Sequence, residues 1–383
     1  MNVAVVRNRS RAGVIARAGR PSPETYGRKS IQRVLDALRA GGHRVECLEA
    51  DKTMLAELER FLPPDPITGG PTGLVLNMAY GIQGDCRYTH APAMLEMAGV
   101  PYTGATPLGH AVSLDKVVAK VLMRDAGVPT PQWTVMSGPG EPLGDLRLPL
   151  IVKPRHESTS CGLQLVTTRG GLDAAVAATV AGYRQEALVE EYVDGRELCV
   201  GLLGNDPPTV LPAVELDFSD RPMRLVTFED KYHRTFDEPG KLCPAPLDRA
   251  LLAEVEAIAV ATFEACHCRD YARVDLRLDA AGRPYVLEIN SMASLGAGGS
   301  FVRAAEEAGL PFDALVNRIV DVAWERAERS GDAPPRVAPA PVAQVQGSVY
   351  SLDVERARIA SRAPSLIPSP EAPMPPNGVS SVR

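Results

Sequence analysis

The sequence predicts a soluble α/β protein of two or three domains, followed by a proline-rich C-terminal segment. The chain has 383 residues, 45% of them hydrophobic and 23% charged, and globular domains usually contain ~100–200 residues. Short apolar strands alternate with helical patterns over the first ~110 residues, as they do in an open α/β sheet. Ten of the 34 prolines lie in residues 331–383, where little apolar surface could offset the entropy of ordering.

The N-terminal elements follow from apolar spacing and from residues that begin or end helices. One helix is expected from a cap at Ser30 to Gly41-Gly42, and another from a cap at Ser113 to Met123. Strands at 3–6, 45–48 and 74–76 and a helix over 91–98 complete this region.

The later part of the chain is expected to be richer in strands. Strands are predicted at 150–152, 188–191 and 197–203, and a long helix over 249–263. Two further strands, Tyr271–Leu278 and Tyr285–Ile289, are separated by turn-forming residues, so we expect an antiparallel hairpin. Residues 331–383 are expected to be largely disordered.

Charge and hydropathy exclude several classes of partner. The 41 Lys+Arg against 47 Asp+Glu give a net charge of -6 and no basic field for nucleic acid or an anionic membrane. No apolar run approaches the roughly 18–20 residues of a membrane helix, and the apolar N-terminus meets Arg7 too early for a signal peptide. A cytoplasmic protein is therefore expected.

The seven cysteines are an odd number scattered along a long chain, which argues against a disulfide framework. Cys266-His267-Cys268 resembles half of a soft-metal site but has no second Cys/His pair at zinc spacing. Buried thiols are the favoured interpretation, and a metal site is the alternative.

The predicted late hairpin carries the most informative side chains. Because side chains alternate along a strand, Arg273 and Asp275 share one face, and Glu288 and Asn290 share a face of the partner strand. Two carboxylates and an amide suit a hard Mg²⁺ ion that takes its other ligands from water and substrate phosphates. A solvated sheet face with a salt bridge is the alternative.

Cationic and hydroxyl groups precede this hairpin. Lys116 is expected in the first turn of a helix and Lys153 at the end of a strand, although either lysine alone would indicate a surface charge. The small loop Glu157–Gly162 could close over phosphate oxygens. It contains the hydroxyl residues Ser158, Thr159 and Ser160.

The segment 188–197 contains groups that suit adenosine. Glu190 can accept from an adenine amino group, the backbone beside Val193 can read the ring edge, and Glu197 can bind two ribose hydroxyls. An exposed acidic run is the alternative interpretation.

In this order the motifs resemble those of the ATP-grasp enzymes, and among them the D-alanine–D-alanine ligases and their relatives. The resemblance covers residues 1 to about 325. It rests on Gly99–Gly104, Leu114–Lys116, Ile151–Pro154, Glu157–Gly162, Val189–Glu197, Asp230–Tyr232, Ala272–Asp275 and Leu287–Asn290. It implies an ATP-grasp fold with an N-terminal substrate domain (1–112), a central lid subdomain (113–188), a catalytic domain (189–330) and a tail (331–383).

The resemblance also implies contacts with ATP. Lys116 and Lys153 would hold the α- and β-phosphates beneath the hydroxyl loop, and Lys231 would approach the γ-phosphate. Adenosine would be bound by Glu190, Val193 and Glu197.

The implied catalytic groups lie near the γ-phosphate. Asp275, Glu288 and Asn290 would bind two Mg²⁺ ions, which Mn²⁺ could replace. Arg273 would neutralise the transferring phosphoryl group, and Thr159 and Tyr232 would close a lid over the site. The implied reaction converts a carboxylate into an acyl phosphate that an amine then attacks.

The substrate side departs from the family pattern. Gly-Gly-x-Ser-x-Glu appears as Gly19–Glu24, so Glu24 can still meet a substrate ammonium. The family's His-Gly followed by Gly-Glu-Asp reads Tyr80-Gly81 and then Gly84–Cys86, and its Pro-Gly-Met-Thr run reads Ala293–Ser300. The resemblance therefore does not imply that D-alanine is the substrate.

The sequence favours an ATP- and Mg²⁺-dependent carboxylate–amine ligase that joins two amino acids or amino-acid-like substrates. A true D-alanine–D-alanine ligase of cell-wall synthesis is one alternative. A nucleotide-binding regulatory protein without turnover is another, although the complete set of phosphoryl-transfer residues argues against it. No nucleic-acid or membrane partner is expected, and a homodimer is compatible with the sequence.

Overall fold

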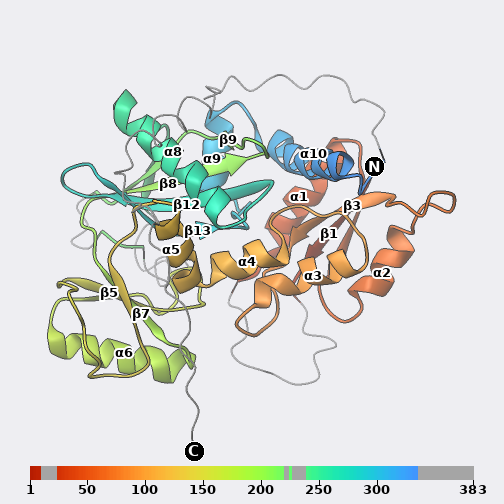
Figure 1. Ribbon diagram of the computed structural model, residues 1–383. Coiled ribbons are helices and arrows are strands. Elements are labelled where there is room, and N and C mark those ends of the chain that lie inside the picture. The colour runs from red at the N-terminus through yellow and green to blue at the C-terminus, as the bar shows by residue number, and fades with distance from the viewer. Residues whose placement is uncertain (10–23, 220–223, 227–238, 335–383) are drawn as a thin grey trace, which may run out of the picture. The chain divides into compact units, whose positions relative to one another are not determined.

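The structure is a computed structural model that describes residues 1–9, 24–219, 224–226 and 239–334 (Figure 1). All of these residues belong to one compact unit, Met1–Gly347. Within it the chain forms three β-sheets with helices packed against them. The predicted α/β class is therefore confirmed.

The N-terminal sheet has three parallel strands in the order β2-β1-β3. They are β1 (Asn2–Arg7), β2 (Arg44–Glu49) and β3 (Gly73–Met78). Four helices pack on this sheet: α1 (Arg28–Ala40), α2 (Met54–Phe61), α3 (His90–Met97) and α10 (Phe312–Ser330).

Strand alternation decides which helices cover which face of this sheet. Val3 and Val5 belong to the apolar cluster that contains α1 and α10. Ala4 and Val6 belong to the cluster that contains α2 and α3. Residues 3–6 of β1 and 74–76 of β3 are apolar without interruption because both faces of a parallel sheet are buried there.

Two predicted helix caps are wrong. Ser30 lies inside α1, whose cap is Gly27, because the helix begins at Arg28. Ser113 ends α4 (Pro107–Leu114), and Asp115 instead caps α5 (Lys116–Asp125) by accepting hydrogen bonds from two backbone N–H groups. An Asp side chain reaches these N–H groups as well as a Ser side chain does, so both residues were eligible caps.

The central sheet is antiparallel in the order β4-β7-β5-β6. Its strands are β4 (Trp133–Met136), β5 (Leu150–Pro154), β6 (Gln164–Val166) and β7 (Ala187–Glu191). Helix α6 (Arg169–Tyr183) packs on Leu150, Val152 and Val189. Because side chains alternate, Lys153 and Glu190 point to the opposite face.

The third sheet follows the order β11-β10-β8-β12-β13, with β9 paired to β8. Its strands are β8 (Arg196–Leu203), β9 (Thr209–Val210), β10 (Val214–Asp217), β11 (Gly240–Leu242), β12 (Tyr271–Leu278) and β13 (Pro284–Asn290). Helix α8 (Arg249–Ala265) covers the face formed by Ala272, Val274 and Leu276. The predicted β12–β13 hairpin is confirmed.

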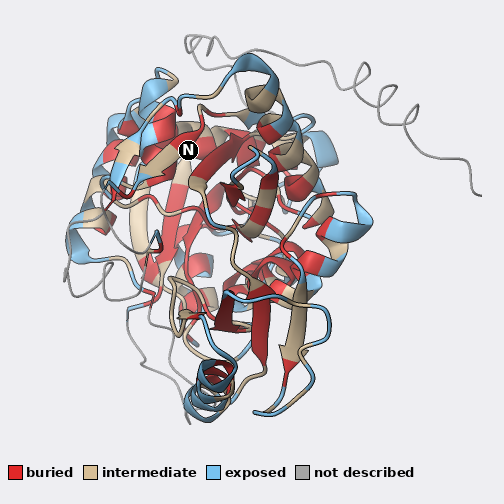
Figure 2. Ribbon diagram, turned by 90° about the vertical axis from the view of Figure 1, so that its left-hand side faces the viewer, coloured by how far each residue is buried: buried red, intermediate tan, exposed pale blue. Residues whose placement is uncertain are grey.

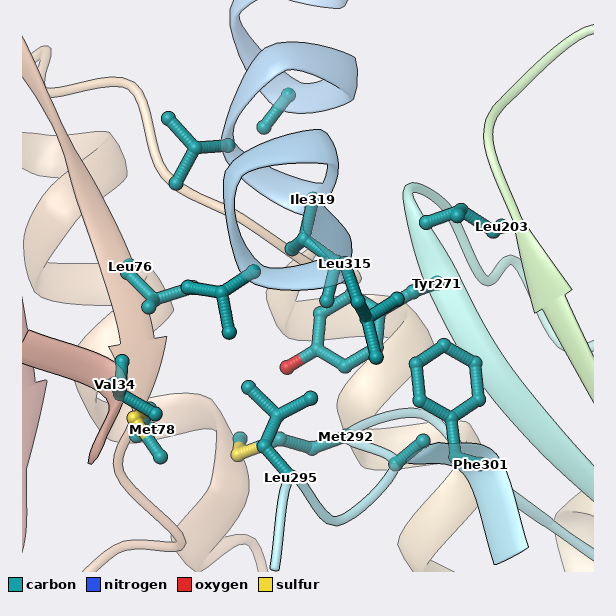
Figure 3. Close-up of a cluster of buried hydrophobic side chains, with 14 of the residues drawn as sticks. Val34, Leu76, Met78, Leu203, Tyr271, Met292, Leu295, Phe301, Leu315 and Ile319 are labelled. Carbon is teal, nitrogen blue, oxygen red and sulfur yellow. The ribbon is translucent and has the colours of Figure 1, made fainter. Parts of the chain in front are cut away.

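The largest apolar cluster joins the first and third sheets. Figure 3 shows Leu315 and Ile319 of α10 between Leu76 of β3 and Tyr271 of β12. Phe301 of α9 (Ser300–Glu307) lies in the same cluster. Figure 2 shows the strands largely buried and the outward faces of the helices exposed. One continuous core therefore connects the two ends of the described chain.

Two further predictions concern segments at the edge of this core. The helix α10 continues to Ser330, and Ala333 is buried, so the folded part extends slightly past the predicted end at residue 330. The rest of the predicted tail lies outside the described residues.

Within the described ranges, no helix is long and apolar enough to cross a membrane. The division into three domains at 112 and 188 stays a proposal.

Candidate active site

The strands β12 and β13 bring the predicted acidic side chains together. In their register Arg273 pairs with Asn290 and Asp275 pairs with Glu288. Arg273 donates to both oxygens of Asp275, at 2.6 Å and 2.7 Å, and Asn290 Nδ2 donates to Asp275 Oδ2 at 2.9 Å. Asp275 is only 8% exposed, whereas the Glu288 side chain is 31% exposed, so the hairpin face is partly buried.

Helix α5 carries two lysines toward the two antiparallel sheets (Figure 1). Lys116 is its first residue, and Lys120 lies one turn later on the same side. Lys116 Nζ is 3.4 Å from Glu288 Oε2 on β13, whereas Lys120 Nζ is 2.8 Å from Glu190 Oε2 on β7. Both lysines are buried, so the surface-charge interpretation of Lys116 is wrong.

Glu190 lies at the centre of a buried charge cluster. Its carboxylate, 3% exposed, contacts the ammonium groups of Lys153 and Lys120. Burial alone would raise the pKa of Glu190, but the two lysines outweigh burial and lower it. Two cations and one carboxylate leave a net positive charge that a bound anion could neutralise. The alternative of an exposed acidic run is wrong at Glu190, and the surface-charge interpretation of Lys153 is wrong as well.

The loop Glu157–Gly162 begins at an ion pair. Glu157 Oε2 lies 3.3 Å from Arg87 Nη2, and the Glu157 carbonyl accepts from Lys116. Thr159 and Ser160 have φ values of +56° and +60°. Residues with side chains rarely adopt this conformation, and it is found more often at functional sites than elsewhere.

The residues predicted to bind adenosine lie around the turn between β7 and β8. Arg277 Nη1 donates to the Val193 carbonyl at 2.8 Å, and Arg277 Nε and Nη2 donate to Glu197 Oε2 at 3.0 Å and 2.9 Å. Glu190 is three residues before Val193, at the end of β7. Val193 and Glu197 thus lie together around Arg277, and Glu190 precedes them in the chain.

Glu24 is buried among tyrosines. The Tyr88 hydroxyl donates to Glu24 Oε2. Tyr80 donates to the Tyr26 hydroxyl at 2.9 Å, and the two rings stack with centroids 5.3 Å apart. Burial raises the pKa of Glu24, although hydrogen bonds from Ser158 and Tyr88 oppose this rise. Glu24 therefore adjoins the hydroxyl loop as well as the tyrosines.

His110 of α4 lies between the hairpin and the tyrosines. Its Nδ1 is 2.8 Å from Ser291 Oγ, directly after β13, and its ring meets Tyr88 edge-on with centroids 6.3 Å apart. Burial lowers the pKa of His110 to about 3, so the imidazole is neutral.

Some predicted residues lie outside the described part of the chain, namely Lys231, Tyr232 and the segment 19–23. Conversely, the structure adds Tyr26, Arg87, His110, Lys120 and Arg277 to the site. Lys120 and Arg277 could have been found from the sequence, because they follow Lys116 by four residues on a helix and Asp275 by two on a strand. The other three come from distant segments without a local signal.

The cysteine pair is not part of this site. Cys266 and Cys268 are buried, Cys268 Sγ lies 3.6 Å from Ser113 Oγ, and burial raises the pKa of Cys268 to about 12. None of the seven cysteines is in a disulfide. Within the ranges that the structure describes, no group of three or more His, Cys, Asp or Glu residues could hold a metal ion.

Comparisons with known proteins agree with this geometry. A family model described as D-ala D-ala ligase C-terminus matches residues 122–321. The uncharacterized protein y4sG of Sinorhizobium fredii (strain NBRC 101917 / NGR234) is 51% identical over 330 residues, 85% of this chain and 98% of that protein. The D-alanine–D-alanine ligase of Moorella thermoacetica is 30% identical over 322 residues, 80% of this chain and 97% of that enzyme.

The crystal structure of D-alanine–D-alanine ligase from Bacillus anthracis complexed with ATP superimposes with a TM-score of 0.65 at 20% identity, over 86% of this chain and 100% of that chain. This likeness concerns the fold. Two antiparallel sheets, one of which includes the acidic hairpin, with the lysines of α5 between them define an ATP-grasp ligase. The chain belongs to the D-alanine–D-alanine ligase family.

Proposed function

We propose that the protein is an ATP- and Mg²⁺-dependent carboxylate–amine ligase that joins two amino acids or amino-acid-like substrates. The observation that carries this proposal is the position of α5 between the sheets. Its Lys116 contacts the acidic hairpin at Glu288, and its Lys120 completes the buried cluster of Glu190 and Lys153. Buried positive charge beside carboxylates suits a nucleotide phosphate chain and its counter-ion.

The nucleotide would lie along this cluster. Lys116 and Lys153 would bind the α- and β-phosphates, beneath the hydroxyls of Ser158, Thr159 and Ser160. Glu190, Val193 and Glu197 would bind adenosine, and the shared contact of Val193 and Glu197 with Arg277 supports the assignment of these two residues. Lys231 and Tyr232 keep their expected roles near the γ-phosphate.

The hairpin residues fit Mg²⁺ in type and placement. Asp275 and Glu288 are cross-strand neighbours. Asn290 Nδ2 donates a hydrogen bond to Asp275, so the Asn290 amide oxygen is the atom that could bind a metal. Two carboxylates and one amide leave the remaining positions to water and phosphate oxygens. Bound there, Mg²⁺ or Mn²⁺ would neutralise phosphate charge and polarise the γ-phosphoryl group.

The chain's own residues would then bind and orient the reactants. One substrate carboxylate attacks the γ-phosphorus, and ADP leaves with the electrons of the broken P–O bond. The second substrate's amine attacks the acyl phosphate, phosphate leaves, and the new amide loses a proton. Arg273, held by Asp275, would stabilise the charge that develops in both steps.

Glu24 would bind the ammonium of the substrate whose carboxylate is activated. The hydroxyls of Tyr88 and Ser158 lie beside it, and Tyr80 stands where the family has His. This difference supports a substrate pair other than D-alanine with D-alanine. The names of the relatives favour D-alanine–D-alanine ligase as the second candidate.

A screen of ADP release with pairs of D- and L-amino acids tests the proposal. We expect Mg²⁺-dependent release with one pair that exceeds the release with D-alanine alone. If D-alanine paired with itself is the best substrate, the second candidate is the function. Tight ATP binding without ADP release for every pair would instead indicate a regulatory protein. A cytoplasmic location and a homodimer stay predictions from the sequence.

A further inference from the structure

Arg277 is a buried cation that the proposed mechanism does not use. It lies on β12 two residues beyond Asp275, and its side chain is 2% exposed. Arg273, Asp275 and Arg277 therefore form one row on the face opposite α8. In the register with β8, Arg277 is directly opposite Glu197.

The guanidinium of Arg277 contacts two of the residues that are proposed to bind adenosine. It donates twice to Glu197 Oε2, at 3.0 Å and 2.9 Å, and once to the Val193 carbonyl at 2.8 Å. It also donates to the Arg224 carbonyl. The rings of Tyr192 and Phe218 lie around it, with centroids 5.1 Å and 5.9 Å from Cζ.

This set of contacts requires arginine rather than another cation. A guanidinium has five N–H donors in one plane, so it can serve a carboxylate and two carbonyls together while its faces meet aromatic rings. Lysine has three donors and no flat face. A methionine would remove the guanidinium from the partly buried Glu197 carboxylate.

We propose that Arg277 is a positioning residue of the nucleoside site. It holds the Glu197 carboxylate in the orientation that receives the ribose hydroxyls, and it fixes the Val193 peptide at the edge of the base. This inference rests on the proposed function, because it takes Glu197 and Val193 as adenosine contacts. It adds a residue that recognises ribose indirectly, through Glu197.

The test measures binding of ATP and of 2′-deoxy-ATP, each with Mg²⁺, by calorimetry without amino acids. We expect the wild-type protein to bind ATP about tenfold more tightly than 2′-deoxy-ATP, since a charge-assisted hydrogen bond to the 2′-hydroxyl is lost. In Arg277→Met and Arg277→Lys, ATP should bind about tenfold more weakly, and the preference for ATP over 2′-deoxy-ATP should largely disappear. A purely structural role would lower the melting temperature without changing that preference.

Arg283→Met is the matched control, because Arg283 is on the same hairpin but 71% exposed, and it forms an ion pair with Asp279. It should keep both the affinity and the preference. If Arg277→Met does not fold, Arg277→Lys, which keeps the charge, carries the test. Equal preference in wild type and Arg277→Lys overturns the inference, whereas a wild-type protein that binds neither nucleotide overturns the proposed function.

Discussion

The proposed nucleotide side and the proposed substrate side of the site are built from different chemistry. On the nucleotide side, each carboxylate faces a cation: Glu190 faces two lysines, Asp275 faces Arg273, and Glu288 faces Lys116. On the proposed substrate side, Glu24 accepts hydrogen bonds from the neutral hydroxyls of Tyr88 and Ser158. Opposite charges at fixed positions suit a constant ligand such as ATP, whereas neutral groups of variable shape choose among substrates.

The largest effect should come from the acidic hairpin of the nucleotide side. Asp275→Asn and Glu288→Gln each remove a charge that would hold Mg²⁺ against ATP, which should cost several kcal/mol of transition-state stabilisation and about a thousandfold in rate. ADP release at saturating Mg²⁺ measures this loss, and circular dichroism verifies the fold. The exposed Glu264 supplies the control Glu264→Gln, which should be fully active. Near-normal turnover in either folded hairpin variant would refute the metal assignment.

His110 connects the two sides, and its neutrality should make stability depend on pH. Burial lowers the pKa of His110 in the folded protein to about 3. Below pH ~6.5 the His110 imidazole is therefore protonated in the unfolded chain but stays neutral in the folded protein. The stability contribution is complete above pH ~6.5 and falls by about 1.4 kcal/mol per pH unit as the pH drops toward 3.

Urea unfolding at pH 7 and pH 5 measures this slope. His110→Gln should lose a component of about 2 kcal/mol between the two values, whereas His267→Gln, at an exposed position, should keep the wild-type slope. Identical slopes in wild type and His110→Gln would show that this imidazole is protonated in the folded protein.

On the substrate side, Glu24→Gln should raise the KM of the activated amino acid by about tenfold, the value of ~1.4 kcal/mol for a charge-assisted hydrogen bond. The affinity for ATP should change less than this KM, since Glu24 is assigned to the amino acid and not to the nucleotide. Steady-state kinetics with each substrate varied in turn separates the two constants. An unchanged KM would contradict the contact between Glu24 and the substrate ammonium. An equal loss of ATP affinity would contradict the separation of the site into a nucleotide side and a substrate side.

The smallest effect should come from a single phenol. Tyr88→Phe removes the hydroxyl that donates to Glu24 and should lower the free energy of unfolding by about 1–2 kcal/mol, with less than a tenfold change in KM. Chemical denaturation measures the first value. Tyr285→Phe, on the partly exposed β13, serves as the control. A stability gain in Tyr88→Phe would contradict the hydrogen bond to a charged Glu24.

The sequence predicted the two sides unequally for a physical reason. Arg273, Asp275, Glu288 and Asn290 lie on adjacent strands of one hairpin, so strand alternation alone placed them together. Lys120 and Arg277 follow the helix and strand periodicities of Lys116 and Asp275, but neither residue belongs to a recognised motif. The neighbours of Glu24 come from segments that are far apart in the sequence and meet only in the tertiary fold. The sequence spacing of residues such as Arg87 and Glu157 therefore does not predict their contact.

The packing of α10 on the first sheet has a consequence for biosynthesis. The strands β1–β3 leave the ribosome before α10, but one of their faces is covered by Leu315, Ile319 and their neighbours near the end of the described chain. More than 200 residues separate Met78 from Phe312. At a synthesis rate of ~5–20 residues per second, about 10–50 s pass before α10 is available to cover that apolar face. During this interval the exposed apolar face of the nascent N-terminal sheet should bind a chaperone. A chain truncated before α10 should aggregate instead of folding.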